Sequence, residues 1–435
     1  MKRKYARWVE LAARRSQLAL WSTFVKWVVL GGLVGLLSGS ASAIFLKSLE
    51  AVTKVRLEHA WLLFLLPVGG ALVSGMYMRY GRNSAKGNNL ILEQIQQGDE
   101  AIPLRMAPLV LIGTLITHLF GGSAGREGTA VQMGGSLADA LGRWLRINSL
   151  DRKILLMCGI SGGFGSIFGT PLAGTVFGLE VIAIGLISHK ALLPCFVASF
   201  TGDLVASRLW GVHHIHYQVD VVPGMDALVL VKVIAASIVF GLVSLLFSEL
   251  THYLKRTFAA LIRNPMLKSA TGGLIIIALV YIAGTRDYLG LGIPLISGSF
   301  TGDVHPFAFL WKLVFTAFTL GTGFQGGEVT PLFAIGATLG NSLAGLLHLY
   351  GPFLASLGFI AVFCGAVNTP IACFIMGIEL FGSGGAVYMF IACVISYLFS
   401  GHSGIYSSQL IGISKSALLP VPEGTTLAAV KELHK

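Results

Sequence analysis

The sequence contains few charged residues. Only 12% of its 435 residues are Asp, Glu, Lys or Arg, whereas soluble globular domains contain about 25%. Hydrophobic residues make up 54% of the chain, so its polar side chains are too few to cover a water-facing surface. The same hydrophobicity excludes a disordered chain. The composition therefore predicts a protein that crosses a membrane several times.

Several kinds of motif are also absent. The five cysteines lie in apolar stretches without CxxC spacing, which argues against a disulfide framework and a cysteine metal site. The long unbroken apolar runs argue against a transmembrane β-barrel, whose strands alternate over about ten residues. Lys and Arg form no stripe interleaved with aromatic residues, so we expect no nucleic-acid partner despite the net charge of +11. A solvated loop explains His213, His214 and His216 better than a metal site does, and we expect no metal or cofactor.

The first 25 residues form a basic segment. They contain six Lys or Arg residues and one acid, Glu10. Because positively charged flanks stay in the cytoplasm, we expect the N-terminus there. Residues 40–43 resemble a signal-peptide cleavage site, but a first membrane helix over residues 26–46 fits better. We expect a transmembrane transport domain over residues 26–420. The tail at 421–435 is too short for a regulatory domain, so the membrane unit is expected to be the whole protein.

Many of the apolar segments are too short to span a membrane as straight helices, which need about 20 residues. Glycine-rich breaks separate them, including residues 121–125 and 326–327. Irregular backbone at membrane depth is tolerated only where protein buries it or water lines it. Short, broken helices therefore predict an all-α transport core. The segments cover residues 26–48, 60–80, 106–120, 128–144, 154–168, 171–188, 191–210, 227–250, 268–284, 307–322, 331–349, 352–366, 370–382 and 385–400.

Three short motifs occur twice, in the same order and about 200 residues apart. The matching pairs are residues 87–91 with 292–296, 127–129 with 328–330, and 170–180 with 369–379. This order predicts an internal duplication, with repeats at about 26–210 and 227–410. In transporters, interrupted helices at corresponding positions of inverted repeats surround the binding site. We therefore expect the site where residues 87–91, 121–129 and 323–331 meet.

The stretch Gly125-Arg126-Glu127-Gly128-Thr129 predicts an anion site at a helix N-terminus. Its glycines leave backbone N–H groups free, and the helix dipole favours negative charge there. An ionised Glu127 can occupy this anion site itself and leave it when protonated, so one side chain can serve as gate and as proton carrier. The alternative is a capping loop in which Glu127 stabilises the dipole. Carboxylates at membrane depth are, however, functional by default.

Residues 326–331 (GGEVTP) form the matching stretch of the second repeat. The glycines again free backbone donors, and Pro331 suits the first turn of a helix. Glu328 is thus a second carboxylate expected at membrane depth, with helix capping as the alternative. Three further acids lie at segment ends, where we expect caps or interface residues: Glu180, Glu249 and Glu379.

These motifs resemble those of the CLC family of anion channels and proton-coupled exchangers. Residues 125–129 resemble its G-[KR]-E-G-P signature, residues 327–331 resemble G-x-F-x-P, and residues 87–91 stand where the family has G-S-G-I-P. The resemblance spans about residues 30–410 and includes Tyr406, which is placed like the family's late anion-binding Tyr. It implies a homodimer with one pore in each subunit and an antiparallel repeat.

The departures from these signatures resemble the bacterial fluoride/proton antiporter branch. Thr129 replaces the signature Pro, Val329 replaces the Phe, and Asn88 stands at the anion-contacting Ser. The resemblance implies that Asn88 and Tyr406 contact the central anion, with Lys86 or Asn89 as alternatives to Asn88. It also implies a bacterial inner membrane as the location. Other implied contributors to the anion site are the Thr330 hydroxyl and the helix-end groups of Gly125, Arg126 and Gly128.

The proton pathway implied by the resemblance differs from that of the chloride/proton exchangers. In those proteins an inner proton glutamate follows a membrane-helix Glu. Here Glu180 is similar to that preceding Glu, and the proton position is Val181. The resemblance therefore implies that Glu328 takes part in proton handling. Lys86 would attract anions if it lies near the pore mouth; otherwise it is one more cytoplasmic positive residue.

The chemistry of the anion contacts agrees with fluoride. Fluoride is small and strongly hydrated, so removing its water requires a dense set of hydrogen-bond donors. An Asn amide supplies two N–H donors where a Ser supplies one O–H. We therefore expect a transporter, not an enzyme, that exports fluoride against inward protons. The closer alternative is a chloride/proton exchanger or a passive chloride channel on the same fold.

A remote alternative is an intramembrane serine protease. Residues 121–125 and 159–163 both fit G-x-S-x-G, with Ser123 and Ser161 as nucleophiles and His118 as a base. The pattern arises readily by chance in a chain with 55 glycines. It also lacks the strand–turn–helix context that such a nucleophile needs.

Overall fold

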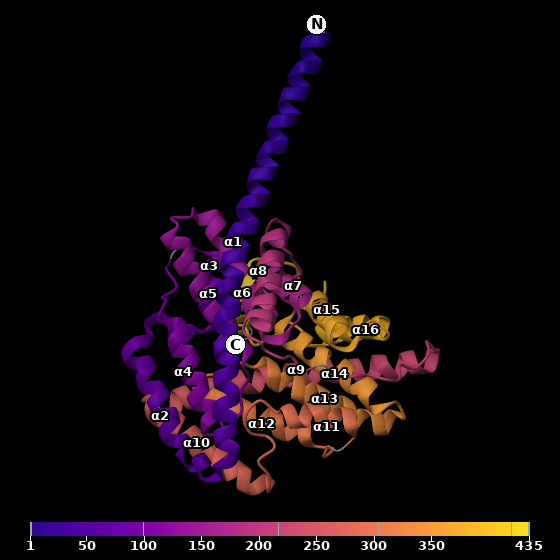
Figure 1. The fold of residues 1–435 in the computed structure, drawn as a ribbon. Helices are drawn as coiled ribbons and strands as arrows, with labels where there is room; N and C mark the ends of the chain where they lie inside the picture. Colours follow the sequence, from indigo (N-terminus) through magenta and orange to yellow (C-terminus); the bar gives the residue numbers. More distant parts are fainter. Residues whose placement is uncertain (1, 99, 216, 303, 419, 434–435) are drawn as a thin grey trace.

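The computed structural model describes residues 2–98, 100–215, 217–302, 304–418 and 420–433, with side chains for those between 17 and 431. Figure 1 shows a body of packed helices from which the start of α1 projects. The helices of the first half are α1 (Lys2–Glu58), α2 (Leu66–Met76), α3 (Asn88–Gln96), α4 (Met106–Leu119), α5 (Glu127–Trp144), α6 (Ser149–Phe168), α7 (Pro171–Glu180) and α8 (Leu192–Leu204). The second half contains α9 (Ala227–Leu261), α10 (Pro265–Ala283), α11 (Ile293–Thr301), α12 (Ala308–Gly321), α13 (Val329–Leu347), α14 (Gly351–Val367), α15 (Pro370–Phe381), α16 (Ala386–Phe399) and α17 (Leu427–Leu433). Short 3₁₀ or π turns lie at Ala60–Leu65, Tyr77–Gly81, Arg82–Lys86, His189–Ala191 and Val205–Leu209.

The two halves repeat the same order of helices. α1 to α8 correspond one by one to α9 to α16. α5 packs on α6 as α13 packs on α14, and α1 contacts α8 as α9 contacts α16. The duplication that the sequence predicts is therefore a structural repeat.

The pair α7 and α15 shows that the repeats are inverted. The carboxylate of Glu180, the last residue of α7, accepts N–H bonds of 3.1 and 2.9 Å from the first turn of α15, at residues 371–372. Glu379 near the end of α15 accepts N–H bonds of 2.9 and 2.8 Å from the first turn of α7, at residues 172–173. Each carboxylate satisfies backbone donors that a helix N-terminus leaves unpaired. Glu180 and Glu379 are thus reciprocal caps between two antiparallel helices.

Glycines allow the closest helix contacts in both repeats. A Cβ at Gly134 of α5 would lie 2.2 Å from the carbonyl oxygen of Gly159 in α6. A Cβ at Gly336 of α13 would lie 2.1 Å from the carbonyl oxygen of Gly358 in α14. In lipid, where burial of apolar surface does not drive helices together, small residues permit the close backbone packing that does. The two pairs occupy matching positions, so both repeats are held by the same kind of contact.

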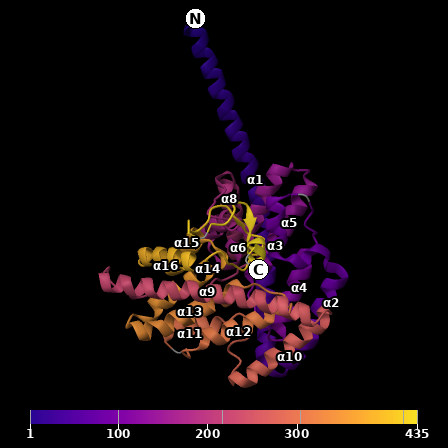
Figure 2. The ribbon, with the colours of Figure 1, turned by 180° about the vertical axis from the view of Figure 1, so that it is seen from behind.

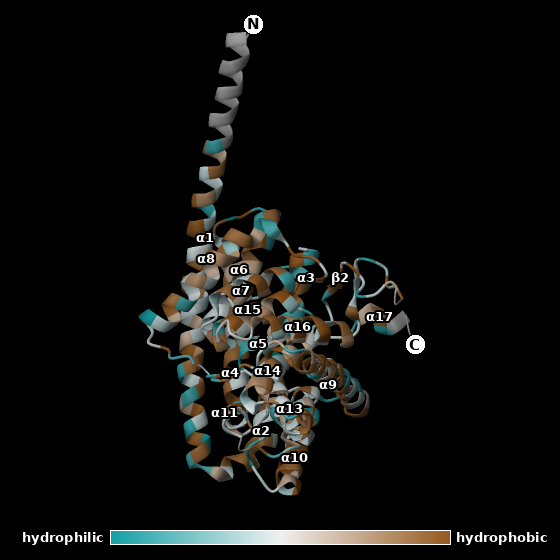
Figure 3. Cartoon of the chain, turned by 90° about the vertical axis from the view of Figure 1, so that its right-hand side faces the viewer, coloured by the Kyte–Doolittle hydropathy of each residue, from teal (hydrophilic) through white to brown (hydrophobic). Residues whose placement is uncertain are grey.

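Length and composition agree with a protein that crosses the membrane many times. Within the described residues, six segments are long and apolar enough to span a membrane: Gln17–Glu58, Ala60–Lys86, His189–Leu209, Ala227–Leu261, Pro265–Ala283 and Val329–Leu347. The apolar helices α4, α12, α14, α15 and α16 are shorter. Figure 3 shows hydrophobic residues, in brown, along helices throughout the body. The predicted set of short and broken apolar helices is confirmed.

The helix α1 is longer than the segment predicted for it. It begins at Lys2 and continues without a break to Glu58, so the N-terminal segment predicted over residues 1–25 is mostly helical. Figures 1 and 2 show this part projecting from the body. The basic side chains of that segment before residue 17 lie outside the side chains that the structure describes.

The chain beyond α7 departs from an all-helical pattern. The helix predicted over residues 171–188 ends at Glu180, and β1 (Ala183–Ile184) follows. β1 pairs in parallel with β2 (Leu410–Ile411), which pairs antiparallel with β3 (Thr425–Thr426). The predicted tail at 421–435 thus contributes a strand and α17 to the fold. Strands of two residues have no alternating pattern that a sequence can reveal.

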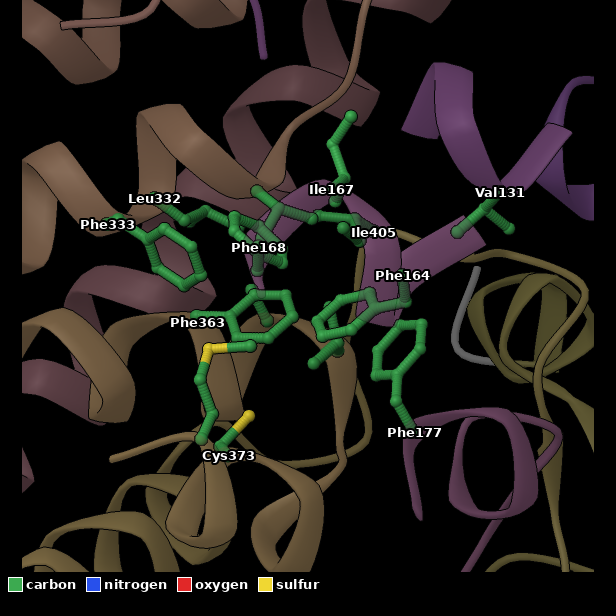
Figure 4. Close-up of a cluster of buried hydrophobic side chains, with 14 of the residues drawn as sticks. Val131, Phe164, Ile167, Phe168, Phe177, Leu332, Phe333, Phe363, Cys373 and Ile405 are labelled. Carbon is green, nitrogen blue, oxygen red and sulfur yellow. The ribbon is translucent and has the colours of Figure 1, made fainter. Parts of the chain in front are cut away.

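Aromatic side chains pack between the repeats. Phe164 of α6 stacks on Phe177 of α7, with ring centroids 4.1 Å apart. Phe363 of α14 lies 6.2 Å from Phe164, and Phe333 of α13 lies 5.1 Å from Phe363. Figure 4 shows these rings together with Val131 of α5. Large buried rings with few rotatable bonds pack densely and keep α6, α7, α13 and α14 in fixed positions.

Candidate functional site

The glycine-rich breaks of the two repeats lie side by side. The N–H of Gly125 donates to the carbonyl of Gly327 (2.6 Å), and the N–H of Gly327 donates to the carbonyl of Gly125 (2.8 Å). α5 and α13 each begin two residues later, so their N-termini converge. The start of α3 is close as well, because a Cβ at Gly128 would lie 3.2 Å from Nδ2 of Asn88. Three helix N-termini, with free N–H groups and positive dipole ends, form an environment that favours an anion.

The carboxylate of Glu127 lies across this junction, and the residue is 1% exposed. Its Oε2 accepts the N–H of Arg126 (3.0 Å) and the N–H of Thr330 (3.1 Å). Its Oε1 accepts the hydroxyl of Thr330 and lies 3.6 Å from Nε of Arg126. A carboxylate of the first repeat therefore caps α13 of the second. Its oxygens occupy the position in which a small anion would meet the same donors.

Glycine is required at both breaks. A Cβ at Gly125 would lie 2.7 Å from Oε2 of Glu127, and a Cβ at Gly327 would lie 2.7 Å from the backbone nitrogen of Gly128. Any larger residue would displace the carboxylate or separate the two helix ends. The backbone of both repeats can thus approach the Glu127 carboxylate closely.

A small cavity of about 10 Å³ lies against Asn88 and Tyr406. This volume corresponds to about one water-sized sphere. Its walls are Asn88, Ile91, Leu92, Val131, Ile160, Phe177, Val181 and Tyr406. Six of these eight residues are apolar, so the Asn88 amide and the Tyr406 hydroxyl are the polar side-chain groups available to an occupant.

A second cavity of about 670 Å³ shares Asn88 and Tyr406 with the first. Its basic lining residues are Lys86, His252, Lys255, Arg256, Lys268 and Lys431, and its acidic lining residue is Glu328. Lys86 and Lys431 are paired with acids at 2.6 Å. In the described part of the chain, no carboxylate lies within ion-pair distance of Lys255, Arg256 or Lys268. The larger cavity therefore has an excess of positive charge, which attracts anions.

Glu328 precedes α13 directly and lies between the helix-end junction and the larger cavity. It is partly exposed and lines the larger cavity, whereas Glu127 is buried. Its Oε2 would be 3.7 Å from a Cβ at Gly128, the residue that follows Glu127. The carboxylates of Glu127 and Glu328 are thus placed on the buried side and on the cavity side of the same junction.

The residues next to Asn88 have other partners. The amine of Lys86 forms an ion pair with Glu93 (2.6 Å). The side-chain oxygen of Asn89 accepts the N–H of Ser408 (3.0 Å), so Asn89 holds the segment that carries Tyr406. Of the three candidate residues at 86, 88 and 89, Asn88 alone lines both cavities.

Comparison with known proteins gives the family. The family model described as "Voltage gated chloride channel" matches residues 69–401. A chloride/fluoride channel protein of Pseudomonas syringae pv. tomato is 50% identical over 427 residues, which are 97% of this chain and 94% of that protein.

The chain belongs to the CLC family.

Solved structures agree with this CLC assignment. The crystal structure of a CLC-type fluoride/proton antiporter matches with a TM-score of 0.86 and 37% identity, covering 88% of this chain and 98% of that one. A slow cyanobacterial Cl⁻/H⁺ antiporter matches with a TM-score of 0.76 and 19% identity, covering 94% and 97%. The second likeness shows the fold alone. The predicted family and fold class are both confirmed.

The positions at which this CLC chain departs from the family's signatures have clear structural surroundings. Thr129, in place of Pro, forms a 2.7 Å hydroxyl–hydroxyl hydrogen bond with Thr114 of α4. Val329, in place of Phe, is 1% exposed within the core. Val181 is 2% exposed and lines the small cavity. An apolar side chain therefore stands where the chloride/proton exchangers are expected to have a proton carrier.

The residues of the protease hypothesis do not form a catalytic pair. Ser123 is fully buried, and its hydroxyl bonds to Thr316 (2.8 Å) and accepts from the amine of Lys312 (2.9 Å). Both ring nitrogens of His118 lack a hydrogen-bond partner among the described residues. A serine nucleophile needs a base within hydrogen-bond reach, and His118 does not bond to Ser123.

The described side chains do not form a metal site. Among the residues that the structure describes, no three His, Cys, Asp or Glu side chains are grouped so that they could hold a metal ion. His216 of the histidine-containing loop lies outside the described residues.

Several polar residues of the cavity were not recognised in the sequence. Gln132 lines the larger cavity from α5, and Lys255 and Lys268 line it from α9 and α10. A signal for Gln132 was present, since it stands four residues after Gly128 and therefore on the same helix face. The two lysines carry no local motif, because only the approach of α9 and α10 to α3 brings them to the site.

Proposed function

We propose that this protein is a proton-coupled fluoride exporter of the CLC type. The observation that carries the proposal is the Glu127 carboxylate, which takes three hydrogen bonds across the N-termini of two broken helices. When ionised, it competes with an anion for these donors. When protonated, it loses the charge that the helix dipoles favour and leaves the position to an anion. One side chain thus links proton transfer to anion movement.

The other residues have separate roles in this proposal. Asn88 and Tyr406 contact the central anion in the small cavity. The hydroxyl of Thr330 and the helix-end groups of Gly125, Arg126 and Gly128 receive the anion once Glu127 leaves. Glu328 carries protons between the larger cavity and the junction.

Fluoride is supported as the substrate by the size and chemistry of the central site. The cavity of about 10 Å³ suits a small ion, and the Asn88 amide offers two N–H donors. The relatives also support it, because one is named a chloride/fluoride channel protein and another a CLC-type fluoride/proton antiporter. The second candidate is a chloride/proton exchanger or a passive chloride channel, and the name of the Pseudomonas syringae relative, a chloride/fluoride channel protein, favours it.

The larger cavity faces the cytoplasm in this proposal. Lys26 of α1 pairs with Asp151 at the start of α6 (2.5 Å), while Arg286 donates to the carbonyl of Ala60 at the opposite end of α1 (2.8 Å). The apolar segment Ala60–Lys86 runs from that end to Lys86, which lines the larger cavity, so the cavity opens on the side of Lys26. The bases on this side include Lys86, Lys255, Arg256 and Lys268, which line the cavity, and Arg152 and Lys153, which follow Asp151 and bond to the backbone at the end of α3. Positive charge marks the cytoplasmic side of a bacterial inner membrane, so the N-terminus is cytoplasmic too.

We also propose that the protein is a homodimer, as its family resemblance implies. α7 and α15 contact each other, α8 packs on α7, and α16 packs on α15. Large apolar side chains remain exposed on α8 and α16: Phe196, Phe200, Phe390 and Leu398. A second copy can cover such a surface within the membrane.

The test is anion efflux from liposomes loaded with fluoride or chloride, with the external pH recorded. We expect fluoride efflux accompanied by proton uptake and little chloride flux. Rapid chloride flux would assign the second candidate function. The absence of flux for both anions would contradict transport.

The positive charge of the larger cavity leads to a prediction about salt. Replacing Lys255 and Lys268 together with Gln should lower fluoride efflux about 3- to 10-fold at low ionic strength, because fewer anions are drawn into the cavity. The loss should disappear at high salt, since the Debye length falls from about 30 Å at 0.01 M to about 3 Å at 1 M. The measurement is initial efflux rate against salt concentration.

A matched control is available for this pair. Lys54 and Lys190 are exposed and do not line the cavity, so K54Q/K190Q should transport fluoride as the original chain does. An equal loss at low and high salt in K255Q/K268Q would mean that the lysines act through structure rather than through charge.

A further inference from the structure

Gln132 is a buried amide that faces the anion pathway. It lies on α5, is 5% exposed and lines the larger cavity together with Asn88. A Cβ at Gly87, the residue before Asn88, would lie 3.4 Å from its Nε2. The side chains of Gln132 and Asn88 therefore enter the same region from α5 and α3.

The two amides have the same unusual orientation. The oxygens Oδ1 of Asn88 and Oε1 of Gln132 are both buried, and neither has a hydrogen-bond partner within the described residues. The amide nitrogens Nδ2 and Nε2 are not among the buried unpaired atoms, and neither donates to a described residue, so they are open to the cavity. Leaving buried acceptors unpaired is unfavourable. An arrangement with acceptors turned away and donors turned inward is the one that an anion stabilises.

The position of Gln132 fits a step between the two cavities. Gly128 and Gln132 are one helical turn apart on the same face of α5, and Nδ2 of Asn88 is near Gly128. Asn88 belongs to both cavities, whereas Gln132 belongs to the larger one. An anion that moves from the larger cavity to Asn88 can therefore exchange water for the N–H donors of Gln132 before it reaches the central site.

We propose that Gln132 is a second amide donor of the anion pathway and a determinant of fluoride specificity. The inference rests on the proposed function and names a residue that the proposed mechanism does not use. Fluoride loses more hydration free energy than chloride when its water is removed, so it depends more strongly on each replacement donor. A purely structural Gln132, packed against Gly87, would influence both anions to the same degree.

The test compares fluoride and chloride transport by Gln132→Met in liposomes. Methionine retains much of the volume and removes both donors, so fluoride kcat/KM should fall about 10- to 100-fold, the effect of one hydrogen bond to a charged group. Chloride flux should change much less. Gln132→Leu, which also removes both donors and adds no charge, should show the same selective loss and serves if the Met variant does not fold.

Gln94 provides the control, because it is equally buried, accepts the N–H of Glu100 (2.8 Å) and lines neither cavity. Gln94→Met should keep the fluoride preference of the original chain. The inference is overturned if both Gln132 variants transport fluoride at the original rate, or if they lose fluoride and chloride flux in equal proportion. A failure of the original chain to transport fluoride would instead overturn the proposed function.

Discussion

Proton uptake should no longer accompany fluoride efflux when Glu127 is replaced by Gln. Glutamine has nearly the same shape and its oxygen can still accept the N–H of Thr330, so the junction between α5 and α13 should remain intact. The amide cannot take up and release a proton, however. Its NH₂ group also stands where the second oxygen of Glu127 accepts the Thr330 hydroxyl. We expect proton uptake to fall at least about 100-fold, the lower range for loss of a proton-transferring group.

The measurement uses liposomes loaded with fluoride in a weakly buffered medium. In the original chain, fluoride appearance outside should be accompanied by a rise of external pH, because protons move inward. In E127Q, the pH should stay constant, and an imposed proton gradient should no longer drive fluoride movement. Glu50→Gln on the exposed side of α1 is the control and should remain coupled. Proton pumping by E127Q at the original rate would rule out Glu127 as the carrier.

The hydrogen bonds of Glu127 explain why a large effect is expected at this position. Its two oxygens accept from the backbone of both repeats and from the Thr330 hydroxyl. No other carboxylate among the described residues bridges two broken helices in this way. Glu180 and Glu379 also cap helices of the opposite repeat, but their helices are continuous. Each of these two residues caps the helix that carries the other. Position and not charge alone therefore distinguishes the proposed gate from the two structural caps.

The sequence predicted these features to different degrees. The repeat, the family and the meeting of residues 121–129 with 323–331 followed from motifs about 200 residues apart, because glycine and carboxylate spacing directly reflects the helix breaks. For Glu180 and Glu379, the sequence alone allows two interpretations, a helix cap or an interface residue. Only the antiparallel packing of α7 on α15 shows that they are caps, and this packing is a long-range contact that no local motif reveals.

Other features left no readable signal. The helices α3 and α11 contain nine residues each, which is too short for a reliable apolar period, so neither was predicted. The sheet formed by β1, β2 and β3 depends on segments more than 200 residues apart. The basic lining of the larger cavity likewise depends on side chains of α9 and α10 that reach the cavity which α3 also lines. Tertiary approach, not local composition, creates these parts of the site.

Replacing Glu328 with Gln should slow proton uptake about 10-fold while fluoride continues to move. Glu328 is partly exposed to the larger cavity and stands on the other side of the junction from the buried Glu127. A proton that moves between Glu127 and the larger cavity has to cross this junction, and Glu328 is the acidic residue that lines the cavity there. Water can replace part of its function, so the expected loss is smaller than that of E127Q.

A double variant separates one pathway from two. If Glu328 takes up the protons that leave Glu127, then E127Q/E328Q should be no slower in proton uptake than E127Q, because residues that act in one sequence give non-additive losses. Independent routes would give the product of the two losses. Glu249→Gln is the control, since Glu249 is near the cavity but pairs with Lys431 (2.6 Å) and does not line it. Unchanged proton uptake in E328Q would confine side-chain proton transfer to Glu127, because protons would then pass between the junction and the cavity through water alone.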